Sequence, residues 1–281
     1  MIRVHSSPIP IHGATPMTNL LAGKQGIIFG VANERSYAWH MAHTLATHGA
    51  SCGFTHLPGE KNQRRTARAL DKIDAIESPW LTPCDASSDQ DIQAVFDKWA
   101  ADHDRLDFVI HSIAFADREW LQPGNFVKTP REAYLSAVDI SAYTLVAMAR
   151  AAQPLMAKSG GGSILAMSYY GSEKVVSGYN IMGVAKAALE SSTRYLAGEL
   201  GEHNIRVNTI SGGPLKTLAA SAVGGIDTML EMGEKASPLR RNVEGSDVGG
   251  AAAFLVSDLA AGITGENIYV DCGLNIVGAA V

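Results

Sequence analysis

Two side chains with complementary chemistry, the phenol of Tyr179 and the ammonium of Lys186, stand seven residues apart. Only Gly183 between them disfavours a helix, so the spacing predicts that both project from one helix face, about 10.5 Å apart. A tyrosine hydroxyl can donate a proton to an oxyanion, and a nearby lysine can hold a cofactor hydroxyl and favour the phenolate. An ordinary solvated helix face would show the same pair, so the pair alone assigns no reaction.

The segments that must position this pair alternate between short apolar runs and stretches with helical periodicity. Buried strands are expected at residues 24–30, 50–55, 80–84, 106–112, 162–168, 206–211 and 267–271. Helices are expected at residues 37–48, 60–72, 89–103, 131–156, 179–200 and 246–257. This alternation predicts an α/β fold: a doubly wound, Rossmann-type parallel sheet of seven strands with helices on both faces.

The composition suits one large domain, since 46% of the 281 residues are hydrophobic and 18% are charged. We assign the catalytic domain to residues 17–281. Residues 1–16, rich in proline and small polar residues, are expected to form a flexible arm, with a short transit peptide as the alternative.

Charge and cysteine usage exclude several classes of protein. A formal charge of −5 and a pI near 6.0 provide no basic surface for nucleic acid. The three cysteines are far apart without C-x-x-C spacing, which argues against a metal site or a disulfide framework and favours a reducing cytoplasm. No run of 18 consecutive apolar residues is present, so no membrane span is expected.

The alternation lapses over residues 212–242, which are long for a connection and contain several glycines. Long insertions in compact domains are usually lids or binding loops. The segment contains the apolar side chains Leu218, Met229, Leu230 and Met232. These predict a substrate lid that folds down onto a hydrophobic ligand.

In a doubly wound sheet a dinucleotide lies at the carboxyl ends of the strands, with its phosphates on the first strand-to-helix turn. Here that turn, residues 30–36, is not G-x-G-x-x-G because it contains only Gly30. Gly30 would allow close approach of a ligand, whereas Ser36 can bond a phosphate or cap the next helix. The turn alone is therefore a weak signal.

The adenosine side leaves the choice between NADH and NADPH open. Asp85 follows the third strand and can accept a hydrogen bond from an adenine amino group or cap the following helix. Residues 55–57 end the second strand without the acidic residue that usually binds the ribose 2′-hydroxyl. Lys61, Arg64 and Arg65 can reach a 2′-phosphate or form a solvated helix face.

Taken together, these residues resemble the NADH-dependent, bacterial enoyl-(acyl-carrier-protein) reductases, a divergent branch of the short-chain dehydrogenase/reductase superfamily, over residues 17–278. Tyr-x6-Lys is the specific feature, because carbonyl-reducing members share Tyr-x3-Lys and Gly183 occupies that position here. The other matching stretches are GVANERSYAW, HSIAF, SYYGSEKVVSGYNIMGVAKAALE, SGGPLKTLAAS and SDLAAGITGENIYVDCG.

The resemblance implies hydride transfer from NADH, with NADPH not excluded, to a trans-2-enoyl thioester on acyl carrier protein, in fatty-acid elongation. It implies Tyr179 at the thioester carbonyl, Lys186 at the nicotinamide ribose and Tyr169 as a second catalytic tyrosine. Implied cofactor contacts are Gly30, Ser36, Tyr37, Asp85, Ala86, Ser112, Ile113, Ala114, Lys186, Pro214, Leu215 and Thr217. Implied substrate contacts are Ala116, Tyr169 and Tyr179, and a cytoplasmic homotetramer is expected.

Two rival functions fit the same fold: a carbonyl reductase or dehydrogenase, and a non-catalytic NAD(P)-binding sensor. An acidic carrier protein would call for a small basic patch near the lid, for which Lys216, Lys235, Arg240 and Arg241 are the candidates. The chain departs from the resembled family at His40, Ala114 and Cys272, where glycine is frequent, and at Leu57, where glutamine is frequent.

Overall fold

The computed structural model describes residues 19–217 and 226–278, which contain a single seven-stranded sheet. Its order is β3-β2-β1-β4-β5-β6-β7, and every neighbouring pair is parallel. The strands are β1 (Gln25–Phe29), β2 (Ser51–His56), β3 (Trp80–Pro83), β4 (Phe108–His111), β5 (Gly162–Ser168), β6 (Ile205–Gly212) and β7 (Asn267–Val270). The predicted fold class is thus confirmed, and the direction of the strand order reverses between β1 and β4.

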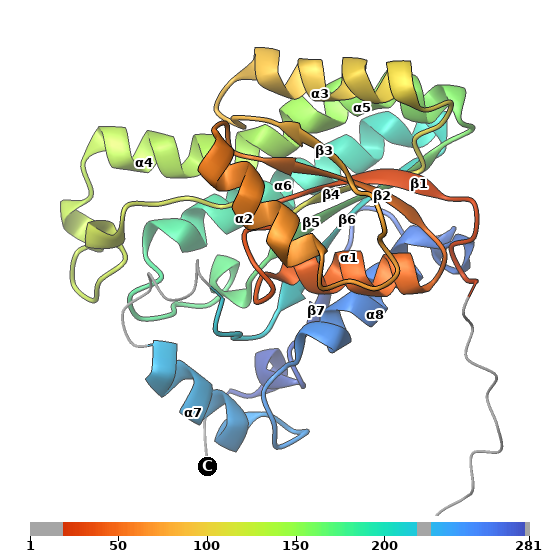
Figure 1. Cartoon of the computed structure of the whole chain (residues 1–281). Helices are drawn as coiled ribbons and strands as arrows, with labels where there is room; N and C mark the ends of the chain where they lie inside the picture. The colour runs from red at the N-terminus through yellow and green to blue at the C-terminus, as the bar shows by residue number, and fades with distance from the viewer. Residues whose placement is uncertain (1–18, 218–225, 279–281) are drawn as a thin grey trace, which may run out of the picture.

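Helices cover both faces of this sheet. They are α1 (Tyr37–Thr47), α2 (Glu60–Leu70), α3 (Asp89–Asp102), α4 (Arg131–Val138), α5 (Thr144–Lys158), α6 (Ile181–Leu200), α7 (Ile226–Ala236) and α8 (Gly245–Val256). Figure 1 shows α3, α5 and α6 on one face and α1 and α8 on the other, with α7 standing apart from these layers. Residues 218–225 of the predicted lid, which include Leu218, and the arm at residues 1–16 lie outside the described residues.

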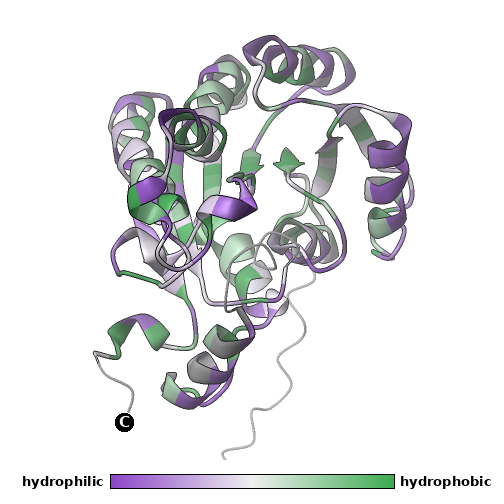
Figure 2. Ribbon diagram, turned by 90° about the vertical axis from the view of Figure 1, so that its left-hand side faces the viewer, coloured by the Kyte–Doolittle hydropathy of each residue, from purple (hydrophilic) through white to green (hydrophobic). Residues whose placement is uncertain are grey.

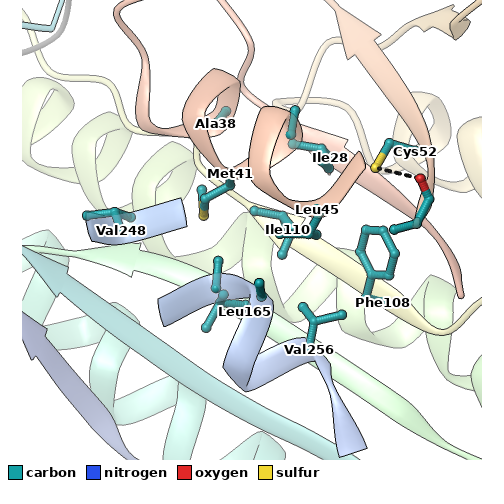
Figure 3. Close-up of a cluster of buried hydrophobic side chains, with 14 of the residues drawn as sticks. Ile28, Ala38, Met41, Leu45, Cys52, Phe108, Ile110, Leu165, Val248 and Val256 are labelled. Atoms are coloured by element: carbon teal, nitrogen blue, oxygen red, sulfur yellow. Dashed lines mark hydrogen bonds between the residues drawn. The ribbon is translucent and has the colours of Figure 1, made fainter. Parts of the chain in front are cut away.

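Successive strand residues point to opposite faces, and this period of two divides the core into two clusters. Ile28 and Ile110 pack under α1 and α8, whereas their neighbours Ile27 and Val109 pack under α3, α5 and α6. Figure 3 shows the first cluster, in which Met41 of α1 approaches the sheet. Figure 2 shows hydrophobic residues concentrated on the central strands of the sheet.

Helices α1 and α8 pack closely because two glycines of α8 face α1. A Cβ added at Gly249 would lie 2.2 Å from Thr44 Oγ1, and one at Gly245 would lie 2.0 Å from the His40 ring. His40 therefore fills space against the bare backbone of Gly245. At Cys272 the backbone has φ +58°, a left-handed conformation that favours glycine over cysteine.

The predicted helix at residues 131–156 is a continuous helical stretch with a π-helical turn, η3 (Asp139–Tyr143), between α4 and α5. Among the described residues, Arg131–Lys158 is long and apolar enough to span a membrane by length and composition, with a mean hydropathy of 1.2. In its most apolar window of 18 residues, 56% is buried inside the fold, and α5 contributes to the core under the sheet. Burial in the core accounts for its apolar sequence.

Candidate active site

Tyr179 lies in a turn before α6, so the prediction of a helix starting at Tyr179 was wrong. Asn180 has φ 44° and ψ −118°, and the helix begins at Ile181. The Tyr179 carbonyl accepts a hydrogen bond from Met182 N at 3.0 Å, which closes the turn. The argument that Tyr179 and Lys186 share a face of one continuous helix therefore fails, and the turn brings Tyr179 to its position.

Lys186 is buried in α6, with 5% of its surface exposed. Its ammonium donates a hydrogen bond of 2.7 Å to the carbonyl of Met167 in β5. Burial lowers the pKa of Lys186 to about 8, while the negative charge of Glu190 opposes that shift. A solvated helix face is therefore excluded for this lysine.

Glu190 follows Lys186 by one helical turn and is 6% exposed. Its Oε1 accepts hydrogen bonds from the hydroxyls of Ser168 and Ser172, the second at 2.7 Å, and from Asn267 Nδ2 at 3.2 Å. The carboxylate thus joins β5, β7 and the short helix η4 (Tyr170–Ser172). The sequence interpretation missed this residue, although an acidic residue four positions after Lys186 was a usable signal.

Tyr169 and Tyr179, the two predicted tyrosines, are in contact. Their ring centroids are 4.8 Å apart at an interplanar angle of 67°, an edge-to-face arrangement. Burial is the main cause that raises the pKa of both phenols above the ordinary value. Both tyrosines are therefore neutral hydrogen-bond donors at pH 7, rather than the phenolate that a neighbouring lysine would favour.

Tyr179 packs against an apolar cluster. Its buried members are Leu121, Ala137, Ile181, Met182 and Ala185, and its partly buried members include Ala116, Trp120, Val138, Tyr179, Val184 and Met229. Met229 comes from α7, so the predicted lid segment contacts the same cluster as Tyr179. The predicted substrate residue Ala116 also belongs to it. We call these residues the apolar wall.

The predicted cofactor residues follow the carboxyl ends of β1, β3, β4 and β6, along one edge of the sheet. At Gly30 the backbone has φ +102°, and an added Cβ would lie 2.1 Å from the Ser112 carbonyl oxygen. Only glycine allows the β1 and β4 ends to approach this closely. This bare backbone at the point where the strand order reverses suits a dinucleotide.

Ser36 caps α1, one of the two roles left open by the sequence. Its Oγ accepts from Trp39 N at 3.3 Å and donates to the Asn33 carbonyl at 2.7 Å. Asp85, by contrast, does not cap α3, because Ser88 does so by accepting from Asp91 N. Asp85 Oδ1 accepts from the amide and hydroxyl of Ser87, which also lowers the pKa of Asp85.

Tyr37 is bonded to the segment after β6. Its hydroxyl donates to the Gly213 carbonyl at 2.5 Å, and burial raises its pKa. This hydrogen bond ties Tyr37 to the backbone just before the remaining predicted cofactor contacts, Pro214, Leu215 and Thr217. Beyond β4, the predicted contacts Ser112, Ile113 and Ala114 lead to Phe115, whose amide donates to Ser141 Oγ at 3.0 Å. Ser141, in the π-helical turn, escaped the sequence interpretation.

The predicted basic patch is largely neutralised. Lys216 pairs with Asp227 at 2.7 Å, and Arg241 pairs with Asp247 at 2.6 Å. Arg240 donates to the Lys235 carbonyl at 2.6 Å, which ties it to the end of α7. Within residues 19–217 and 226–278, no group of His, Cys, Asp and Glu side chains is placed to hold a metal ion.

A family model described as enoyl-(acyl carrier protein) reductase matches residues 30–275. The chain belongs to the enoyl-(acyl-carrier-protein) reductase family. Among curated members, the NADH-dependent enoyl-(acyl-carrier-protein) reductase of Nostoc sp. is 47% identical over 92% of this chain and 98% of that protein. The resemblance inferred from Tyr-x6-Lys is therefore confirmed.

Two solved reductases have the same fold. The enzyme from Anaplasma phagocytophilum, in complex with NAD, superposes with a TM-score of 0.88 at 43% identity, covering 94% of this chain and 98% of that chain. The enzyme from Bacillus cereus, with NADP+ and an indole naphthyridinone, gives a TM-score of 0.89 at 45% identity, covering 93% and 100%.

Proposed function

We propose that this protein reduces the carbon–carbon double bond of trans-2-enoyl thioesters on acyl carrier protein, with NADH as the hydride source, in the last reductive step of fatty-acid elongation. The observation that carries the proposal is that buried Lys186 bonds to Met167 near the carboxyl end of β5, while Tyr179 packs against Tyr169, which directly follows β5, and against the apolar wall. Membership of the reductase family supports the same reaction.

The residues present fit a dinucleotide. Gly30 lets the carboxyl ends of β1 and β4 come together at the point where the strand order reverses, α1 begins at the same edge of the sheet, and Lys186 is the candidate for the nicotinamide ribose hydroxyls. When bound, NADH supplies the hydride that adds to the β-carbon of the enoyl group. Every other part of the reaction falls to side chains of this chain.

Tyr179 stabilises the charge that develops on the thioester carbonyl oxygen. Its phenol is neutral at pH 7, so it donates a hydrogen bond to the forming enolate. One such donor in a site that excludes water contributes about 2.7–4 kcal/mol to the transition state, or roughly 10²–10³ in rate. Tyr169, packed edge to face on Tyr179, holds that ring in place and faces the substrate.

The apolar wall excludes water and receives the acyl chain. Met229 of α7 contacts this wall, so α7 is the described part of a lid over the substrate. Lys216 and Arg241 are paired with carboxylates, which leaves Lys235 and Arg240 as the candidate contacts for an acidic carrier protein.

The remaining features of the proposal concern assembly and place. The catalytic domain spans residues 17–281, acts as a homotetramer and works in the cytoplasm. The outward face of α5 and α6 supports self-association: it has a depression of about 370 Å³ lined by the small residues Ala188, Ser191 and Ser192, beside Tyr195, which is 74% exposed. Small residues let another helix approach closely. Light scattering of the purified protein measures the assembly directly.

A carbonyl reductase is disfavoured by the packing of Gly183, the position that would carry the lysine of Tyr-x3-Lys. A Cβ there would lie 2.6 Å from the Gly171 carbonyl oxygen, so no larger side chain fits. A non-catalytic sensor is disfavoured by the burial of Lys186, because a charged group is expensive to bury without a function for it.

The test is an absorbance assay with crotonyl thioester, run in parallel with NADH and NADPH and with a simple ketone as the alternative substrate. We expect oxidation of NADH with the enoyl thioester and none with the ketone. Turnover of the ketone without the enoyl thioester would replace the proposal by carbonyl reduction. Binding of NADH without turnover of either substrate would favour the sensor.

A further inference from the structure

Asn180, the residue after Tyr179, has a backbone conformation that few residues other than glycine adopt. Its φ of 44° and ψ of −118° lie outside both helical wells. Such conformations persist only where the surrounding structure over-determines them, and they gather at functional sites. Here the conformation turns the chain sharply between Tyr179 and the first residue of α6.

The Asn180 side chain supplies the restraint. Its Nδ2 donates to the Trp120 carbonyl at 2.8 Å and to the Gln122 carbonyl at 2.7 Å. A side-chain amide nitrogen has two hydrogens, so both are used. The acceptors are 60 and 58 residues away in sequence, in the loop at residues 120–122, which begins at the last residue of the short helix η1 (Arg118–Trp120).

That loop also forms part of the apolar wall. Trp120 and Leu121 belong to the cluster that contains the Tyr179 side chain. The same loop is therefore connected to Tyr179 twice: through side-chain packing, and through the Asn180 amide to the turn that carries Tyr179. A displacement of the loop would move the Tyr179 hydroxyl.

We infer that Asn180 is a positioning residue that locks the turn carrying Tyr179 to the loop at residues 120–122. The inference rests on the proposed function in one respect, that Tyr179 is the donor to the reacting oxygen. Asn180 acts through Tyr179, because its amide is saturated by backbone carbonyls. A displacement of about 1 Å at a reacting group can lower a rate by as much as about 100-fold.

Asn204 provides a matched control. It also has a positive φ, +58°, and its Nδ2 donates to a backbone carbonyl, that of Gly160, at 3.0 Å. It is exposed and precedes β6, at the amino end of that strand, whereas the site lies at the carboxyl ends. Asn204→Gly therefore removes the same kind of hydrogen bond at a position that does not contact the turn carrying Tyr179.

The experiment measures kcat and KM for Asn180→Gly, Asn180→Asp and Asn204→Gly, each in the parent and in the Tyr179→Phe background. Glycine accepts the positive φ, so Asn180→Gly removes the two hydrogen bonds while relieving the backbone. Asn180→Asp keeps the shape but places carboxylate oxygens against two carbonyl oxygens.

We expect Asn180→Gly to lower kcat by about tenfold or more, Asn180→Asp to lower it further, and Asn204→Gly to stay within twofold of the parent. In the Tyr179→Phe background, Asn180→Gly should cause no additional loss, because the hydroxyl to be positioned is gone. A kcat within twofold of the parent for Asn180→Gly, or an equal loss in both backgrounds, would overturn the inference.

Crystal structures of the parent and of Asn180→Gly give a readout that does not depend on turnover. We expect the Tyr179 hydroxyl to shift by about 1 Å or more in Asn180→Gly and to stay in place in Asn204→Gly. An unmoved hydroxyl in Asn180→Gly would contradict the inference. A parent that fails to reduce enoyl thioesters would contradict the proposed function instead, and the crystallographic comparison would still decide the role of Asn180.

Discussion

The ammonium of Lys186 donates a hydrogen bond of 2.7 Å to the carbonyl of Met167, which fixes the lysine of α6 to the carboxyl end of β5. The hydrogen bond partly compensates the ammonium for the loss of its water on burial. Burial keeps the pKa of Lys186 near 8, so the group is charged at neutral pH and carries an energetic penalty for being so.

Lys186→Met should therefore stabilise the fold while removing activity. The lysine pKa falls from its usual 10.5 to about 8 on folding, a difference that corresponds to about 3 kcal/mol of destabilisation at pH 7. Losing the hydrogen bond to Met167 offsets about 1 kcal/mol of the gain. Denaturant unfolding at pH 7 should show the variant about 2 kcal/mol more stable than the parent.

The stability advantage of Lys186→Met over the parent should shrink at higher pH. The folded parent binds fewer protons than its unfolded chain between pH 8 and 10.5, so its stability rises over that interval relative to Lys186→Met. Unfolding curves at pH 7 and pH 10 measure the difference. A variant less stable than the parent at pH 7 would show that the buried ammonium is favourable.

The activity of the parent should fall as the pH rises through about 8. The charged form of Lys186 is the one that holds the ribose hydroxyls, and it disappears above its pKa. The pH profile of kcat/KM for NADH reports the free enzyme, so its alkaline limb should appear near pH 8. A profile that stays flat to pH 10 would show that cofactor binding does not depend on the charge of Lys186.

Glu190→Gln should move that alkaline limb to lower pH. The Glu190 carboxylate raises the pKa of Lys186 and opposes the effect of burial. Glutamine keeps an acceptor oxygen for Ser172 and Asn267 but removes the charge. The same pH profile measured on the variant checks this, and an unmoved limb would mean that the charge of Glu190 does not reach Lys186.

Gly30→Ala should raise the KM for NADH by tenfold or more. The added methyl group would collide with the Ser112 carbonyl oxygen and force the β1 and β4 ends apart. Gly23→Ala is the control, because Gly23 also has a positive φ, +79°, but open space around it. Strain at φ alone amounts to roughly 1–2 kcal/mol in both variants. Equal KM values for NADH in the two variants would show that the Gly30 turn is not part of the cofactor site.

The fold could be predicted from the sequence because its signals are local and repeated. Each strand from β1 to β7 is a short apolar run, and each crossover helix carries its own periodic stripe, so the layered sheet follows without knowledge of contacts. The order of the strands, by contrast, comes from the structure, because the same alternation is compatible with more than one doubly wound order. Tyr-x6-Lys identified the family because Gly183 leaves no room for the shorter spacing.

The features that escaped prediction depend on contacts between distant segments. Helix α6 begins two residues later than expected because Asn180 is bound by the loop at residues 120–122, which its own neighbours in sequence do not reveal. Glu190 gains its role from partners on β5, η4 and β7. The expected basic patch was wrong in part because Lys216 and Arg241 pair with acidic side chains.

The central claim, that the Tyr179 hydroxyl stabilises the enolate of an enoyl thioester, is tested most directly by kcat of Tyr179→Phe. Tyr134→Phe is the matched control, because Tyr134 is an exposed tyrosine of α4 that lies outside the proposed site. With crotonyl thioester and saturating NADH, we predict that Tyr179→Phe lowers kcat by roughly 10²–10³ while Tyr134→Phe leaves it unchanged. A kcat for Tyr179→Phe within twofold of the parent would contradict the claim.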